Sequence, residues 1–166
     1  MKKNFLFAAM AVTALASCSN DDVVDVNNGG GISFRASLDR AVTRTNVTSL
    51  QNLAAFNVTA IGDGKNYFTN LGVSSPDNGV NWTTASTYYW LGYELAFFAY
   101  APQTLASTVS INNASKKITD FSPAKAVADQ KDLVISYNKG TKAVNEGSGV
   151  AMNFKHALSQ IEVKAK

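Results

Sequence analysis

The sequence contains one cysteine and one histidine among its 166 residues, and this scarcity excludes several kinds of chemistry. A single thiol cannot form an internal disulfide, so the fold must be held together by packing alone. Zinc takes several His, Cys or carboxylate ligands, and the sequence supplies no such set at a recognisable spacing. Nucleophilic catalysis usually needs a base beside the nucleophile, whereas His156 stands in a predicted strand with no carboxylate near it in sequence. We therefore predict no catalytic residue, no metal, no cofactor and no enzymatic activity.

Charged residues are also few, at 16% of the chain, and neither sign dominates. Lysine and arginine number 15 and aspartate and glutamate 12, and two of the cations, Lys2 and Lys3, lie at the extreme N-terminus. No basic stripe with interleaved aromatic residues is present, which argues against nucleic acid as a partner. Beyond residue 18 no apolar run is long enough to predict a membrane-spanning segment.

What is present at the N-terminus is a short targeting signal. Lys2 and Lys3 precede an apolar run from Phe5 to Leu15, which is too short to cross a bilayer. The run ends in Leu15-Ala16-Ser17-Cys18, which resembles the lipobox of bacterial lipoproteins. That resemblance implies a signal peptide over residues 1–17, cleavage between Ser17 and Cys18, and acylation of the Cys18 thiol and of the new amino group. A plain secretory signal, with Cys18 left as a spare thiol, is the alternative.

Acylation at Cys18 would tether the mature chain to a membrane, because each buried CH₂ group contributes about 0.8 kcal/mol and dual acylation anchors stably. Residues 18–31 then form a flexible spacer that is acidic and ends in three glycines. Its aspartates, Asp21, Asp22 and Asp25, lack the closing glutamate of a calcium loop. Acidic residues after a lipidated cysteine resemble the signal that sends lipoproteins of some Gram-negative anaerobes to the outer face.

The remaining residues, 32–166, predict one all-β domain. Ile32, Phe34, Ala36 and Leu38 alternate with polar residues, as in a half-buried strand. Residues 56–61 and 67–71 predict a hairpin around 62–64, and the segment 94–100 is apolar on both faces, as in a central strand. Further strands are expected at 109–111, 118–121, 132–137 and 150–154. A slip in alternation at 156–160 predicts a β-bulge.

Two other segments break this pattern. Residues 50–54 show helical spacing and predict one or two turns of helix, and residues 139–149 predict a long polar loop. Many short strands separated by turn signals favour a β-sandwich or barrel of about seven or more mostly antiparallel strands.

Several segments together resemble the fimbrillin family of surface lipoproteins from Gram-negative anaerobes. The segments that carry the resemblance are Thr43-Arg44, Phe56–Ala60, Phe97–Pro102, Lys131–Val134 and, most specifically, Phe154–Ile161. The resemblance implies a transthyretin-like β-sandwich over residues 32–166 as an N-terminal domain. In this family a second sandwich normally follows, and the present sequence stops at Lys166, where that domain would begin.

The family resemblance also implies a route of assembly. A protease cuts after an arginine in the loop behind the first strand, for which Arg44 is the first candidate and Arg40 the second. The strand with Ile32, Phe34, Ala36 and Leu38 then leaves, and a donor strand from another subunit fills the groove. The alternative is that both arginines are ordinary solvated loop residues.

The implied role is that of a fimbrial subunit or accessory anchor on the exterior of the outer membrane. Its partners would be other fimbrial subunits or copies of itself, together with host or bacterial surface ligands. The alternative function is a lipid-anchored glycan-binding module that uses the aromatic stretch Tyr88–Tyr100, although aromatic residues in strands more often fill a core.

Overall fold

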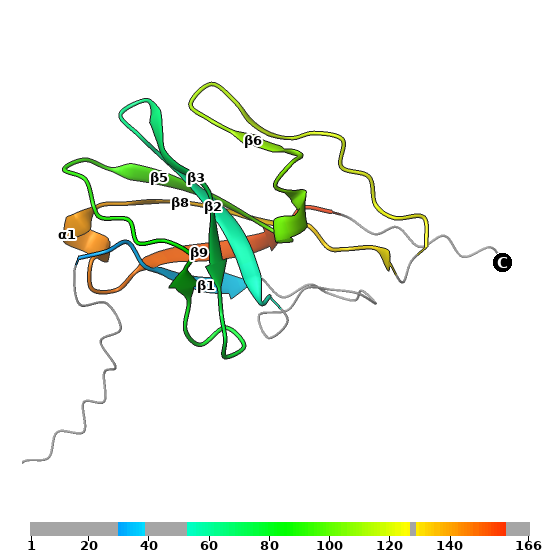
Figure 1. Cartoon of the computed structure of the whole chain (residues 1–166), viewed down its shortest axis with the longest axis horizontal. Coiled ribbons are helices and arrows are strands. Elements are labelled where there is room, and N and C mark those ends of the chain that lie inside the picture. The colour runs from blue at the N-terminus through cyan, green and yellow to red at the C-terminus, as the bar shows by residue number, and fades with distance from the viewer. Residues whose placement is uncertain (1–29, 39–52, 127–128, 159–166) are drawn as a thin grey trace, which may run out of the picture.

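The computed structural model describes residues 30–38, 53–126 and 129–158 (Figure 1). The predicted lipidation site with Ser17 and Cys18, the tether up to residue 29, and both candidate cleavage arginines, Arg40 and Arg44, lie outside these ranges. The same holds for residues 50–52 and 159–166, so only part of the predicted helix and of the predicted bulge can be compared with the structure.

The described part of the chain is nearly all β, which confirms the predicted fold class. One curled sheet contains seven strands in the order β1-β9-β8-β5-β2-β3-β4, and a small second sheet pairs β6 with β7. The strands of the large sheet are β1 (Phe34–Leu38), β2 (Ala55–Gly62), β3 (Lys65–Ser74), β4 (Thr83–Thr84), β5 (Leu95–Ala101), β8 (Val134–Gly140) and β9 (Val150–His156). The remaining elements are η1 (Gln103–Leu105), β6 (Val109–Ile111), β7 (Lys116–Ile118) and α1 (Lys142–Asn145).

The predicted hairpin is present as the antiparallel pair β2–β3. Asp63 and Gly64 form its turn with φ of 49° and 70°, the left-handed conformation that aspartate and glycine tolerate best. β5 lies between β2 and β8 in the middle of the sheet and ends at Ala101, before Pro102, as its apolar sequence predicts. Alternation in the sequence therefore locates both the hairpin and the central strand.

The core lies inside the curl of the sheet, and aromatic rings fill much of it. Phe56, Phe97 and Phe154 are fully buried, and the rings of Phe56 and Phe154 lie 5.0 Å apart at 61°. Trp90 packs edge-on against Phe97 at 6.0 Å. Since tilted and edge-to-face rings add to the free energy gained by burial alone, these pairs stabilise a core that has no disulfide.

The curl brings the two outer edges of the sheet together. Gly31, just before β1, forms an antiparallel bridge with Tyr89, which follows β4. The Ile32 amide donates to the Tyr88 carbonyl at 2.7 Å. Chain segments at opposite ends of the strand order are thus hydrogen-bonded, and the sheet partly closes on itself.

Three predicted boundaries were wrong. The segment 139–149 is not all loop, because β8 continues to Gly140 and α1 follows. Polar contacts hold this helical turn: the Asn145 side chain accepts from the Thr141 amide and donates to the Gly149 carbonyl. The strand predicted at 118–121 lies at Lys116–Ile118. Leu53 and Ala54 are not helical, and β2 begins directly after them.

The bulge predicted at 156–160 lies partly outside the described residues and stays a prediction, and the structure shows an irregularity in a different strand. It falls in β2, where the register with β3 shifts around Thr59. β9 continues without such a shift to His156, and residues from 159 onward lie outside the described part.

Candidate functional site

The candidate site is the edge of the large sheet formed by β1. Within the part of the chain that the structure describes, this strand pairs with β9 alone, in parallel, and the register runs from Phe34 opposite Val150 to Leu38 opposite Phe154. All other pairs in the two sheets are antiparallel. Parallel pairing is slightly less stable per residue than antiparallel pairing, so β1 is joined by the weaker type of ladder.

The four residues predicted to share one face of this strand do so. Ile32 and Phe34 are 4% and 5% exposed, and Ala36 and Leu38 are half-buried against the core. The Phe34 ring meets Phe97 edge-on at 5.7 Å. The intervening Arg35 and Ser37 point to solvent, which gives β1 one apolar and one polar face.

Backbone geometry at the start of β9 fixes the position of β1. Gly149 has φ of 69°, and a Cβ built on it would lie 3.1 Å from Ser33 Oγ and 3.3 Å from the Ser33 carbonyl oxygen. The next amide, that of Val150, donates to that same carbonyl at 2.8 Å. Glycine is therefore needed at this close approach of the two segments.

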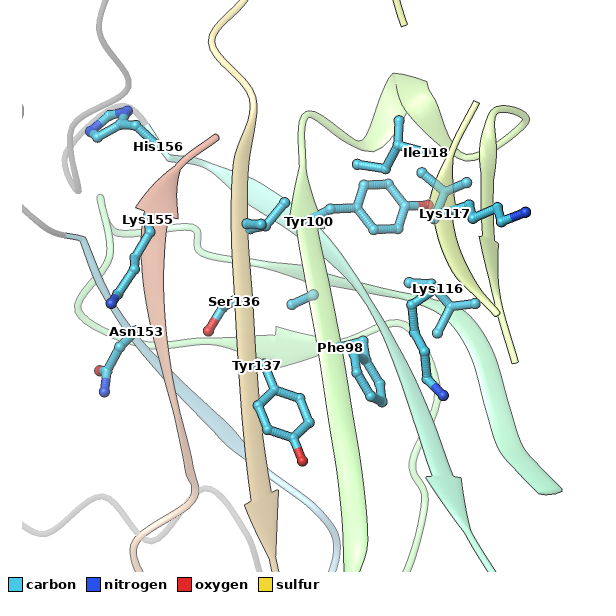
Figure 2. Close-up of a pocket in the computed structure, with 14 residues that line it drawn as sticks. Phe98, Tyr100, Lys116, Lys117, Ile118, Ser136, Tyr137, Asn153, Lys155 and His156 are labelled. Atoms are coloured by element: carbon cyan, nitrogen blue, oxygen red, sulfur yellow. The ribbon is translucent and has the colours of Figure 1, made fainter. Parts of the chain in front are cut away.

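A second feature is a groove on the outer face of the sheet, lined by residues of β5, β8 and β9 and by the β6–β7 hairpin on the side of β5 away from β8 (Figure 2). Its volume is about 620 Å³. The Phe98 and Tyr137 rings lie 4.9 Å apart on its floor, and Lys116 Nζ sits 5.5 Å from the centre of the Phe98 ring. No pattern in the sequence predicts this groove, because β5 and β8 are brought together only by the fold.

Tyr100 lies buried at one end of the same groove and anchors a polar network. Asn57 Nδ2 donates to its hydroxyl at 3.0 Å, and the hydroxyl donates to Asn70 Oδ1 at 2.9 Å. Burial raises the pKa of the Tyr100 hydroxyl above its ordinary value, while the hydrogen bond from Asn57 acts in the opposite direction. The hydroxyl therefore serves as a neutral cross-link between β2, β3 and β5.

The aromatic stretch proposed as a sugar platform is divided between core and surface. Trp90, Phe97 and Tyr100 are buried, whereas Tyr89 and Tyr93 are 58% and 44% exposed. Tyr89 is held through its backbone, since its carbonyl accepts from the Tyr67 hydroxyl at 2.9 Å. Most of the stretch thus packs inside the protein, and its exposed members are two separate tyrosines.

His156 is nearly buried and has the carboxylate that its sequence neighbours do not provide. Its Nδ1 lies 2.5 Å from Asp132 Oδ2, a residue 24 positions away at the start of the chain segment leading into β8. In the described part of the chain, His156 Nε2 has no hydrogen-bond partner, so no hydroxyl nucleophile contacts it there. The pair links β9 to the segment before β8.

The described residues lack two further features. They contain no group of three or more His, Cys, Asp or Glu side chains placed to hold a metal ion. No helix among them is long and apolar enough to span a membrane.

The fold and the site define a class: an all-β domain whose outermost strand is joined to the sheet on one side only and has an apolar face in the core. Comparison with known proteins assigns the chain to a family. Residues 40–166 match the fimbrillin-like family, and the chain belongs to this family. Membership supports a structural role in a fimbria at the cell surface.

Among solved structures the chain is similar to a fimbrial protein from Bacteroides ovatus. The two share 14% identity with a TM-score of 0.45, over 76% of this chain and 28% of that protein. The chain thus spans little more than a quarter of that protein's length. No curated protein sequence matches the chain.

Proposed function

We propose that this chain is a subunit or accessory anchor of a fimbria and that it assembles by exchange of its first strand. In this proposal Cys18 carries the lipid that holds the precursor on the exterior of the outer membrane. Cleavage at Arg44, or at Arg40, frees residues N-terminal to the cut. Other fimbrial subunits, or copies of this chain, supply the replacing strand, and the assembled fibre mediates adhesion to host or bacterial surfaces.

The position of β1 carries the proposal. Among the described residues β1 pairs with a single strand, so its departure breaks the β1–β9 pair and the contacts of the preceding residues with Tyr88 and Tyr89, while every other strand pair stays intact. The residues immediately after it, from 39 onward, include both candidate arginines. A cut there would leave β1 attached to the protein by non-covalent contacts alone.

Removal of β1 would leave a surface that favours replacement. Fully burying a side chain such as Ile32 or Phe34 contributes about 1.5–3 kcal/mol, so their loss exposes costly apolar pockets. The backbone groups of β9 that pair with Phe34–Leu38 would also lose their partners. An incoming strand with alternating apolar residues restores both kinds of contact at once.

The test is treatment of the full-length chain with an arginine-specific protease, followed by electrophoresis without boiling. We expect cleavage after Arg44, release of the N-terminal fragment and a ladder of strand-exchanged oligomers. The double variant Arg40→Gln/Arg44→Gln should block both cleavage and laddering, and the two single variants show which of the two arginines is cut. Cleavage of the unsubstituted chain that leaves only monomers with β1 still bound would contradict the proposal.

Lipid attachment is tested separately by mass spectrometry of the protein recovered from membranes. We expect a chain that begins at Cys18 and carries acyl groups on it, and Cys18→Ser should abolish the modification. An unmodified thiol at Cys18 would contradict the anchoring step without affecting strand exchange.

A further inference from the structure

The groove on the outer face of the sheet is apolar in its floor and basic at its rim (Figure 2). Ile135 and Tyr137 of β8 are 43% and 55% exposed within it, unusual for such side chains on a sheet that buries its other face. Lys116, Lys117 and Lys155 line it, and in the described part of the chain no carboxylate side chain does. Such a surface fits an extended polypeptide that carries both aliphatic and acidic side chains.

One segment of this chain has that composition. Residues 19–28 read SNDDVVDVNN, with three aspartates, three valines and no cation. When Lys2, Lys3 and these aspartates are removed from the totals of 15 cations and 12 anions, 13 and 9 remain, a net charge of +4. The acidic segment and the rest of the protein are therefore of opposite charge.

The described end of the chain lies where this segment can reach the groove. A Cβ built on Gly30 would lie 2.6 Å from Glu146 Oε1, so the chain enters β1 beside α1, which follows β8 (Figure 1). The 7 residues of β8 span about 23 Å. Residues 19–29, extended, span about 36 Å, which exceeds the length of that strand.

We infer that residues 19–28 fold back along the outer row of β8 and occupy this groove. Val23, Val24 and Val26 contact the apolar floor, and the aspartates face the lysines of the rim. Attachment to the same chain keeps the segment at a high effective concentration, so weak individual contacts suffice. The groove would then be vacated whenever the N-terminal segment is removed with β1.

The experiment is carbodiimide cross-linking of the full-length chain, which joins carboxylates to lysine amines that contact them, with sites read by mass spectrometry. We expect Asp21, Asp22 and Asp25 to couple to the groove lysines in preference to Lys125 and Lys131, which lie outside the groove. Even coupling to all lysines would overturn the inference.

Performing the reaction on a mixture of ¹⁴N- and ¹⁵N-labelled chains separates the two possible sources of the segment. Mixed-label products as the main species would overturn folding back within one chain.

Two variants test the contacts themselves. Replacing Val23, Val24 and Val26 together by serine keeps every carboxylate, so cross-links to the groove should be lost only if the valines hold the segment in place. Val80→Ser, at an exposed position outside the groove, is the matched control and should leave the cross-links unchanged. Persistence of the groove cross-links in the triple variant would overturn the inference. Binding of an acidic oligosaccharide that Tyr137→Ala abolishes, with no segment cross-links, would identify a different occupant and overturn it too.

Discussion

Phe34 connects β1 to the aromatic core. Its ring meets Phe56 and Phe97 edge-on at 6.3 and 5.7 Å. We expect Phe34→Ala to lower the free energy of unfolding by about 3–5 kcal/mol, because truncation of a buried aromatic leaves a cavity. Urea denaturation measures this loss, and Arg35→Ala on the opposite face should change stability by less than about 0.5 kcal/mol. Equal losses in the two variants would contradict the assignment of the buried face.

Tyr100 gives a prediction about pH. Because burial raises the pKa of its hydroxyl in the folded state, its contribution to stability is complete below the ordinary value of 10.0 and is lost as pH rises through the folded pKa. Tyr100→Phe should flatten this alkaline loss, measured as unfolding free energy against pH. At neutral pH the substitution should lower the free energy of unfolding by about 1–3 kcal/mol, because Asn57 then loses a buried partner. An unchanged alkaline slope would contradict this role.

At the scale of single residues, sequence predicts which side chains are buried but not which ones meet. Alternation identified Ile32 and Phe34 as core residues, and the structure agrees. The contact between His156 and Asp132 was not predicted, because the two stand 24 positions apart and depend on how β8 and β9 pair. Periodicity carries information about faces, whereas partners across strands follow from register.

At the scale of elements, Gly149 determines where β9 begins and how β1 lies beside it. Gly149→Ala places a Cβ in the left-handed region at a cost of about 1–2 kcal/mol and crowds the Ser33 backbone. Relative to the unsubstituted protein, we expect the Gly149→Ala substitution to increase the rate of hydrogen exchange more in β1 than in β5. Gly147→Ala is the control, since nothing lies within 4 Å of its built Cβ. Similar exchange in both variants would show that Gly149 does not position β1.

β1 also shows which features of the fold the sequence can predict and which it cannot. The strand around residues 32–38, the hairpin of β2 and β3, and central β5 follow from alternation and turn residues. The parallel pairing of β1 with β9 does not, because it joins Ser37 to Asn153 across 116 positions and leaves no local signal. The sequence predicts a loop where α1 lies, because the four residues of α1 show no apolar periodicity and Asn145 holds the turn through polar contacts.

At the scale of the whole molecule, Tyr67 couples the two edges of the curled sheet. From β3 its hydroxyl donates to the Tyr89 carbonyl at 2.9 Å and accepts from the Tyr89 amide at 3.3 Å. The segment it holds is the one that pairs with Gly31 and Ile32 ahead of β1. The release of β1 therefore depends on contacts made on the far side of the sheet as well as on β9.

Removing that hydroxyl should loosen β1 without touching it. Each hydrogen bond contributes about 0.5–1.5 kcal/mol, so Tyr67→Phe should increase hydrogen exchange of Phe34–Leu38 by about fivefold or more. Release of the N-terminal fragment after arginine-specific cleavage should accelerate in parallel. Tyr93→Phe, at an exposed tyrosine elsewhere, should leave both rates unchanged. If Tyr67→Phe lowered protection uniformly through β2, β5 and β8, Tyr67 would support the fold as a whole, and strand release would be governed by the β1–β9 pair alone.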